Sequence, residues 1–291
     1  MRGFAAFVAL CAIAPLVHGV MQSLKARLQG RPGPSPLQPY RDLAKLWQKE
    51  TLVPGEGMQL FALAPGFALG SALTLAAAVV WAGHARPPLI DVVALIFVMA
   101  LGRAAVATAA LEVGSSFTGM AAARDAAFSV VVEPALLFLL LGGAAAGSGT
   151  GVEGLTPDRF DAASVTAITA AFLTVLAEAG RIPFDTHDTH YELTMIHEGL
   201  SLEYSGSSLA LLHAAAYVRQ ASLFILVGFL VPPIAGWWTP AAVAGVIAVV
   251  VPIVENAYAK ARLFAVPQLL ASALVLAVAA VALRFPGLWP R

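Results

Sequence analysis

Acidic and histidine side chains gather in one stretch of an otherwise apolar chain. Residues 178–206 read EAGRIPFDTHDTHYELTMIHEGLSLEYSG. A charged side chain at the centre of a bilayer costs about 2.5–3.5 kcal/mol on insertion scales, so it must be paired, neutralised or hydrated. This segment therefore indicates a buried polar site whose carboxyl groups handle protons or other cations.

Further charged residues fall inside or at the edges of apolar runs. They are Arg103, Glu112, Arg124, Asp125, Glu133, Glu178, Arg219 and Glu255. Loss of water favours the neutral form of a carboxyl group, which can then take up and release a proton near neutral pH. The pattern predicts a proton relay. A purely structural network of hydrogen-bonded carboxyl groups is the alternative.

The spacing of these charges suggests ion pairs. Glu178 and Arg181 are three residues apart, which predicts a pair on one helix face. Glu112 follows Arg103 by nine residues, and Glu133 follows Arg124 by nine. We expect tertiary pairing in these two cases.

The histidines of the acidic segment raise the question of a metal. His187, Asp188 and His190 could ligate one, but their neighbours do not form a recognised zinc pattern. A solvated polar loop is a second interpretation. Acids alternate here with apolar residues such as Leu193, Ile196 and Leu200, and this favours a helical piece covered by a partner protein.

Composition identifies the elements that must position these groups. The chain has 291 residues, of which 59% are hydrophobic and 12% charged, and its mean hydropathy is +0.81. These values indicate an all-α, polytopic membrane protein. About eight apolar runs are long enough to cross a bilayer. Their expected limits are 4–21, 60–83, 89–111, 126–146, 162–179, 208–231, 240–254 and 267–283.

Charge and cysteine content exclude several functions. Lys plus Arg and Asp plus Glu are both 17, so no basic excess points to nucleic acid. The lone cysteine, Cys11, excludes an internal disulfide and leaves no thiolate set for a zinc or iron–sulfur site. We expect no metal and no cofactor in this chain, and any redox centre must belong to another subunit.

The loops alternate in basic content, which predicts the orientation. By the positive-inside rule the more basic set of loops is cytoplasmic, and both termini lie on the outer side of the cytoplasmic membrane. The expected cytoplasmic residues are Lys25, Arg27, Arg31, Arg41, Lys45, Lys49, Arg124, Arg181, Lys260 and Arg262.

We expect one integral membrane domain, 1–291, with an interfacial loop at 22–59 and an acidic cytoplasmic loop at 181–207. In the first loop Leu37, Tyr40, Leu43, Ala44 and Trp47 recur at helical spacing opposite basic residues. This pattern predicts an amphipathic helix on the membrane surface, either as an anchor or as a surface for docking a partner.

Four blocks of sequence carry a family resemblance. They are 27–50 (RLQGRPGPSPLQPYRDLAKLWQKE), 111–134 (LEVGSSFTGMAAARDAAFSVVVEP), 177–206 and 255–270 (ENAYAKARLFAVPQLL). The chain resembles the membrane-anchor subunit shared by respiratory complex I, where it is known as subunit 1, and by membrane-bound nickel–iron hydrogenases of the formate hydrogenlyase and hydrogenase-4 type. THYELTMIHEGLSLEYSG is similar to the hydrogenase branch.

The resemblance implies partners and roles. The chain would dock soluble hydrogenase large and small subunits at its cytoplasmic face and pass a redox-driven change to antiporter-like membrane subunits. The nickel–iron centre and the iron–sulfur clusters would lie in partner subunits. The implied lining acids are Glu133, Glu178, Asp185, Glu192, Glu198, Glu203 and Glu255, to which burial adds Glu112 and Asp125, with Arg103, Arg124 and Arg181 as basic partners.

The chain departs from the family pattern at several positions. It has GMAAARD at 119–125 where the hydrogenase branch usually shows GMGASRE, and Ala216 stands where complex I has a glutamate before Tyr217. We expect a subunit that couples electron transfer to proton or sodium movement, so that Gln at Glu133 or Glu203 uncouples the two. The alternatives are a quinone-site subunit of a NADH dehydrogenase-like complex and a passive membrane anchor.

Overall fold

A computed structural model describes residues 2–55, 57–82, 90–146, 151–185, 196–233, 236–259, 261 and 265–285. The regular elements of these ranges are all helices, which confirms the predicted all-α class. They are α1 (Arg2–Leu28), α2 (Gln38–Trp47), α3 (Gln59–Trp81), α4 (Val92–Glu112), α5 (Ser116–Ala146), η1 (Val152–Leu155), α6 (Ala162–Glu178), α7 (His197–Leu200), α8 (Gly206–Gly228), η2 (Gly236–Trp238), α9 (Thr239–Ala257) and α10 (Val266–Arg284).

Seven of the described helices are long and apolar enough to cross a membrane: α1, α3, α4, α5, α8, α9 and α10. The expected fifth span is α6, a shorter apolar helix of 17 residues. At 1.5 Å per residue it is about 26 Å long, slightly less than the thickness of a bilayer core. The protein is therefore a polytopic membrane protein, with eight long apolar helices in the part of the chain that the structure describes.

One helix begins earlier than its apolar run. The sequence predicted a span from residue 126, whereas α5 begins at Ser116 and has 31 residues. Residues 119–125 (GMAAARD) are rich in alanine, the best helix former, and the turn before them contains Gly114 with a positive φ of 72°. Arg124 and Asp125 consequently lie within a helix and not in a loop.

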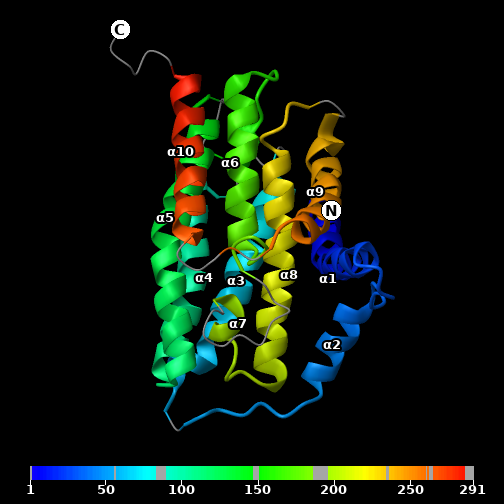
Figure 1. Cartoon of the computed structure of the whole chain (residues 1–291), viewed down its shortest axis with the longest axis vertical. Coiled ribbons are helices and arrows are strands. Elements are labelled where there is room, and N and C mark those ends of the chain that lie inside the picture. Colours follow the sequence, from blue (N-terminus) through cyan, green and yellow to red (C-terminus); the bar gives the residue numbers. More distant parts are fainter. Residues whose placement is uncertain are drawn as a thin grey trace.

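The long helices form one bundle (Figure 1). On one side α10 packs against both α5 and α6, and across the bundle α3 lies between α4 and α8. Helices α9 and α1 continue the bundle beyond α8. A continuous apolar core links these layers, with Leu75, Leu95, Leu176 and Leu223 almost fully buried. Polar side chains inside such a bundle must find their partners on neighbouring helices.

The predicted amphipathic helix is confirmed as α2. It lies beside α1 and α8 near one end of the bundle (Figure 1). The Tyr40 hydroxyl donates a hydrogen bond to the carbonyl of Ala12. Gly19 permits the close approach of this loop, because a Cβ atom there would overlap the carbonyl oxygen of Pro36. The placement of α2 on the membrane surface stays a prediction.

The segment after α2 is attached to the beginning of α8. The backbone N–H of Leu52 donates to Ser205 Oγ at 2.9 Å, and Thr51 Oγ1 lies 2.8 Å from Ser207 Oγ. Gly206 has a φ of +55° and packs against the carbonyl oxygen of Glu50. The first loop and the end of the acidic segment therefore form one surface.

Two aspartates cap the N-termini of α4 and α6. Asp91 accepts a hydrogen bond from the backbone N–H of Val93 at 2.8 Å, and Asp161 accepts one from that of Ser164 at 2.7 Å. These hydrogen bonds lower the pKa of the Asp161 carboxyl group. Capping of this kind satisfies N–H groups that have no partner within the helix.

We predict that Asp161→Ala lowers the free energy of unfolding by about 1 kcal/mol through loss of the α6 cap. The control is Asp161→Asn, which keeps an acceptor oxygen. Because the folded-state pKa is depressed, the wild-type advantage over Asp161→Ala is present above the ordinary pKa of Asp and is lost as the pH falls through the folded-state pKa. Thermal unfolding between neutral and acidic pH measures the stability difference between the wild type and Asp161→Ala. A difference that does not change with pH would contradict the prediction.

Candidate functional site: a buried carboxylate and arginine cluster

Arg103 is the centre of a charged cluster inside the bundle. It lies within α4, and its Nη2 donates a hydrogen bond to Glu178 Oε1 at the end of α6. Its Nη1 lies 3.8 Å from Glu133 Oε1 of α5. Glu178 is 2% exposed. One guanidinium group therefore connects acids from two other helices.

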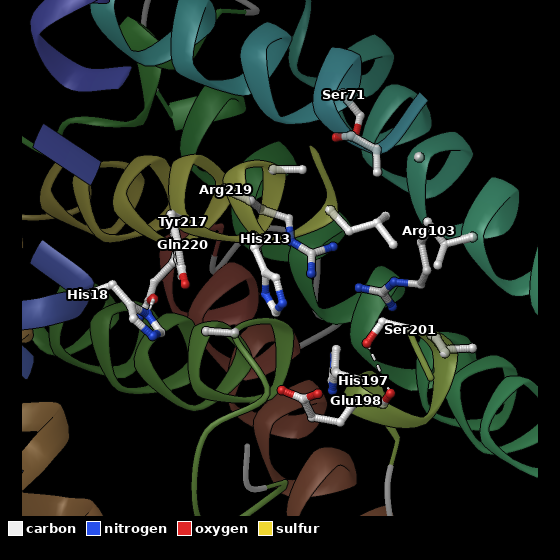
Figure 2. Close-up of a pocket in the computed structure, with 18 of the residues that line it drawn as sticks. His18, Ser71, Arg103, His197, Glu198, Ser201, His213, Tyr217, Arg219 and Gln220 are labelled. Carbon is white, nitrogen blue, oxygen red and sulfur yellow. Dashed lines mark hydrogen bonds between the residues drawn. The ribbon is translucent and has the colours of Figure 1, made fainter. Parts of the chain in front are cut away.

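Asp125 of α5 and Arg219 of α8 complete this cluster. Asp125 is buried, and Arg219 lies close enough to both Glu178 and Asp125 to attract them. Figure 2 shows Arg219 extending from α8 toward Arg103, with His213 on the same helix. We call Arg103, Asp125, Glu133, Glu178 and Arg219 the central cluster. It brings together three acids that the sequence predicted as part of one pathway.

Asp185 connects the two described parts of the acidic segment. Its buried carboxylate accepts a hydrogen bond from the backbone N–H of His197 at 3.1 Å, and His197 Nδ1 lies 3.2 Å from the same oxygen. The predicted pathway acid Glu192 and the candidate metal ligands His187, Asp188 and His190 lie outside the described residues.

A second ionic network lies between α1, α8 and α9. Glu255 of α9 pairs with Arg181 Nη1 at 3.4 Å and with Lys25 Nζ at 3.4 Å. Arg181 Nη2 also donates to Gln220 Oε1 at 3.1 Å. His18 Nδ1 lies 3.0 Å from the same oxygen. We call these residues the Glu255 network.

These partners correct three expectations about local pairs. Glu178 pairs with Arg103 and Arg181 with Glu255, because α6 ends at Glu178 and Arg181 lies beyond the helix. The two nine-residue spacings fall within single helices, α4 and α5. Nine residues span about 13.5 Å along a helix, which is too far for contact. Arg124 instead donates to the sulfur of Met120 at 3.8 Å.

Glu112 is placed apart from the central cluster. Its carboxylate accepts a hydrogen bond from the backbone N–H of Phe61 at 2.7 Å, in the first turn of α3. An acid at a helix N-terminus satisfies a free N–H and interacts favourably with the helix dipole. Glu112 therefore has a structural contact that accounts for its position.

Tyr204 packs over the same turn of α3. Its ring stacks on that of Phe61 with centroids 4.0 Å apart, and its hydroxyl donates to the Phe61 carbonyl at 3.1 Å. Burial, followed by the charge of Glu112, raises the pKa of Tyr204 above its ordinary value. Together these contacts fix the acidic segment against α3.

We predict that Tyr204 stays protonated at a pH where exposed tyrosines ionise, about 10. The unfolded chain then releases a proton that the folded chain retains, so stability falls as the pH rises above that value. The Tyr204→Phe variant removes this dependence and costs about 1 kcal/mol at neutral pH. Tyrosinate absorbance of the two proteins tests this, and ionisation of Tyr204 with the exposed tyrosines would contradict it.

The remaining predicted acids differ in exposure. Glu198 of α7 is partly buried and lines a cavity. Glu203 is exposed. An exposed carboxyl group exchanges protons with water directly, so only Glu198 of these two belongs with the interior groups.

A cavity of about 250 Å³ lies between the two networks. Residues from α1, α3, α4, α5, α7 and α8 line it. They include Asp125 and, as labelled in Figure 2, His18, Ser71, Arg103, Glu198, His213 and Arg219. The cavity is large enough for several water molecules or the head of a small ligand. The central cluster and the Glu255 network therefore share a polar chamber.

Sequence reasoning missed several polar residues of this chamber. His18 and Gln220 are buried and face each other from α1 and α8, and His213 lines the same space. The signal that could have found them is the general rarity of ionisable residues inside membrane spans. His18 lies within the first apolar run, and Gln220 follows Arg219.

The fold and the buried charges define the class first: a polytopic membrane protein with an interior ionic network. The family model for NADH dehydrogenase matches residues 2–285. The chain belongs to the NADH dehydrogenase family and is a membrane subunit of a complex I-like oxidoreductase complex.

The relatives support this placement. Formate hydrogenlyase subunit 4 of Escherichia coli (strain K12) is 32% identical over 280 residues, covering 89% of this chain and 90% of the relative. Hydrogenase-4 component C of the same strain is 32% identical over 233 residues, covering 75% and 71%. An NADH-quinone oxidoreductase subunit of Solibacter usitatus (strain Ellin6076) is 27% identical over 252 residues, covering 79% and 63%.

The fold also matches a solved structure. A chain in the structure of the membrane-bound sulfane sulfur reductase (MBS), an archaeal respiratory membrane complex, aligns with a TM-score of 0.78 over 97% of this chain and 98% of that one. The sequence identity is 14%, so the likeness concerns the fold alone.

Proposed function

We propose that the chain docks a soluble redox arm at its cytoplasmic face and couples electron transfer there to movement of protons or sodium ions. The observation that carries the proposal is the central cluster, in which Arg103 holds the buried Glu178 and approaches Glu133, whose side chain is 35% exposed. A cluster of this kind is expensive in a membrane and is characteristic of ion pathways.

The docking surface in this proposal is the end of the bundle formed by the first loop, α7 and the start of α8. The loop carries Arg31, Arg41, Lys45 and Lys49, which favours the cytoplasmic side for this end and the outside for both termini. Asp185 and His197 connect this surface directly to the central cluster. A movement of the docked arm would therefore displace the Asp185 carboxylate first.

The relatives suggest the partners. By analogy with formate hydrogenlyase subunit 4 and hydrogenase-4 component C, the arm would contain hydrogenase large and small subunits that hold the nickel–iron centre and the iron–sulfur clusters. Antiporter-like membrane subunits would continue the ion path sideways in the bilayer. This chain would contribute carboxyl groups and no redox centre.

The test is ion flux in sealed vesicles that contain the purified complex. We expect internal pH or sodium to change with electron transfer, and an ionophore to abolish the gradient without slowing turnover. Electron transfer at full rate with no ion movement would instead assign the chain as a passive anchor. Identification of the copurifying subunits tests the proposed partners in the same preparation.

One observation favours a second candidate function. The 250 Å³ cavity is lined by α1 residues His18 and Gln22, close to the start of the first loop, where a quinone-site subunit would hold its ligand. Turnover of an added quinone that is sensitive to a competitive inhibitor, and lost in His18→Leu, would support this function. Absence of quinone turnover in the active complex would exclude it.

A further inference from the structure

Two buried carboxylate oxygens of the central cluster lack hydrogen-bond partners among the residues that the structure describes. They are Asp125 Oδ2 and Glu178 Oε2. Asp125 is 4% exposed and Glu178 is 2% exposed, so bulk water does not satisfy these atoms. Leaving a buried acceptor without a donor costs about 1–3 kcal/mol, and more when it is charged.

A small second cavity lies beside both acids. Its volume is about 20 Å³, and Arg103, Asp125, Glu178, Asp185 and His197 line it. A polar cavity holds a water molecule when it offers roughly 10–15 Å³ to the probe and two to four polar partners. The cavity meets both conditions for one water molecule, because its volume suffices and the two residues with unpartnered carboxylate oxygens are among its polar lining groups.

We propose that this cavity is a binding site for one ordered water molecule, which bridges Asp125 and Glu178. The water donates one hydrogen to each carboxylate, which is the pairing that both oxygens need. The Arg103 guanidinium and the His197 ring are cavity-lining groups that can donate to its oxygen. The site would thus connect α5 to α6 through a molecule that can itself accept and release protons.

The position of the water gives it a role that rests on the proposed function. Arg103, Asp125 and His197 line both the small cavity and the 250 Å³ chamber. A proton from the chamber could therefore reach Asp125, cross the water to Glu178 and continue along the cluster. The guanidinium of Arg103, which lies beside both acids, cannot replace the water in this step because it does not release protons.

Val132 permits a test that leaves every charged group unchanged. It is 4% exposed and lines the small cavity, so Val132→Ile adds a methylene group to that space. The matched control is Val130→Ile, the same change on the same helix at a position that is 72% exposed. Filling a dry void would raise or maintain stability, whereas displacing a bridging water strands two carboxylate oxygens and lowers it.

The experiment is a high-resolution cryo-electron microscopy map of the intact complex, combined with thermal unfolding. We expect a density peak within hydrogen-bonding distance of both oxygens in the wild type and in Val130→Ile. In Val132→Ile we expect the peak to vanish and the melting temperature to fall. No peak in the wild type, or a higher melting temperature for Val132→Ile, would overturn the proposal. A peak and a melting temperature that depend on sodium would overturn it too, by assigning the site to a cation.

Ion flux separates this proposal from the proposed function. If the wild type moves protons and Val132→Ile moves them at least tenfold more slowly at equal electron transfer, the water is part of the path. If flux is unchanged while the peak is lost, the water is only structural and its role in the path is wrong. If the wild type moves no ions, the proposed function fails, and the water site is judged on the map alone.

Discussion

Arg103→Met is expected to lower the free energy of unfolding by about 3–5 kcal/mol, because it leaves the buried charge of Glu178 without its hydrogen-bonded partner. Glu178 has a side chain that is 1% exposed, so water cannot replace the guanidinium. The same substitution also removes the cation near Glu133. Thermal or chemical unfolding of the purified complex, followed by helix content, measures the loss.

Two further variants show whether charge or packing causes the effect. Arg41→Met changes an exposed arginine of α2 and should alter stability by less than about 0.5 kcal/mol. Arg103→Met combined with Glu178→Leu should recover much of the lost stability, because the leucine at position 178 carries no charge that needs a partner. If Arg103→Met were as stable as the wild type, Glu178 would not depend on Arg103 for its charge, and the central cluster would lose its organising pair.

Glu133→Gln is expected to separate ion movement from electron transfer. Glutamine keeps the shape of the side chain and cannot carry a proton between its partners. Because a positioned acid or base contributes about 10²–10⁴-fold to a proton transfer, ion flux should fall about a hundredfold or more. Electron transfer to an artificial acceptor should stay close to wild type, since the proposed function assigns it to the docked arm.

Glu203→Gln is the comparison for this experiment. The sequence predicted that it would uncouple like Glu133→Gln, but Glu203 lies on the surface of this chain, outside the central cluster. We therefore expect flux and turnover to stay coupled in Glu203→Gln. Equal loss of flux and electron transfer in Glu133→Gln would indicate an assembly defect and would contradict a role in conduction.

The sequence predicted the elements of this protein well because their signals are local. Apolar length identified the eight helices, and helical spacing from Leu37 to Trp47 identified α2. The start of α5 was missed because GMAAARD is polar enough to end an apolar run while it still favours a helix. Hydropathy measures the environment of a segment, whereas helix propensity measures its conformation. The limits of an apolar run can therefore differ from the limits of the helix that contains it.

The site was predicted as a set of residues but not as a set of contacts. Arg103 and Glu178 are 75 residues apart, and Arg181 and Glu255 are 74 apart. Which side chains meet depends on the rotation of each helix within the bundle, and the many near-uniformly apolar helices here give little information about rotation. Local spacing therefore suggested Glu178 with Arg181, whereas the bundle pairs each with a distant residue.

The role of Glu112 also could not be predicted from the sequence. Its burial made it a candidate for the ion path, but its carboxylate is used by the N-terminus of α3, 51 residues earlier in the chain. No local sequence motif marks an acid that caps a helix distant in the chain. Only the assembled structure distinguishes such a group from Glu133 and Glu178.

Infrared difference spectroscopy of the complex before and after reduction is the most direct test of whether the central cluster carries ions. It detects the C=O band of a carboxyl group that gains or loses a proton. We expect such a band in the wild type and expect Glu133→Gln or Glu178→Gln to remove it, while Glu203→Gln leaves it in place. A spectrum in which no carboxyl band changes on reduction would contradict ion conduction through the central cluster. A band that survives both Glu133→Gln and Glu178→Gln would contradict it as well.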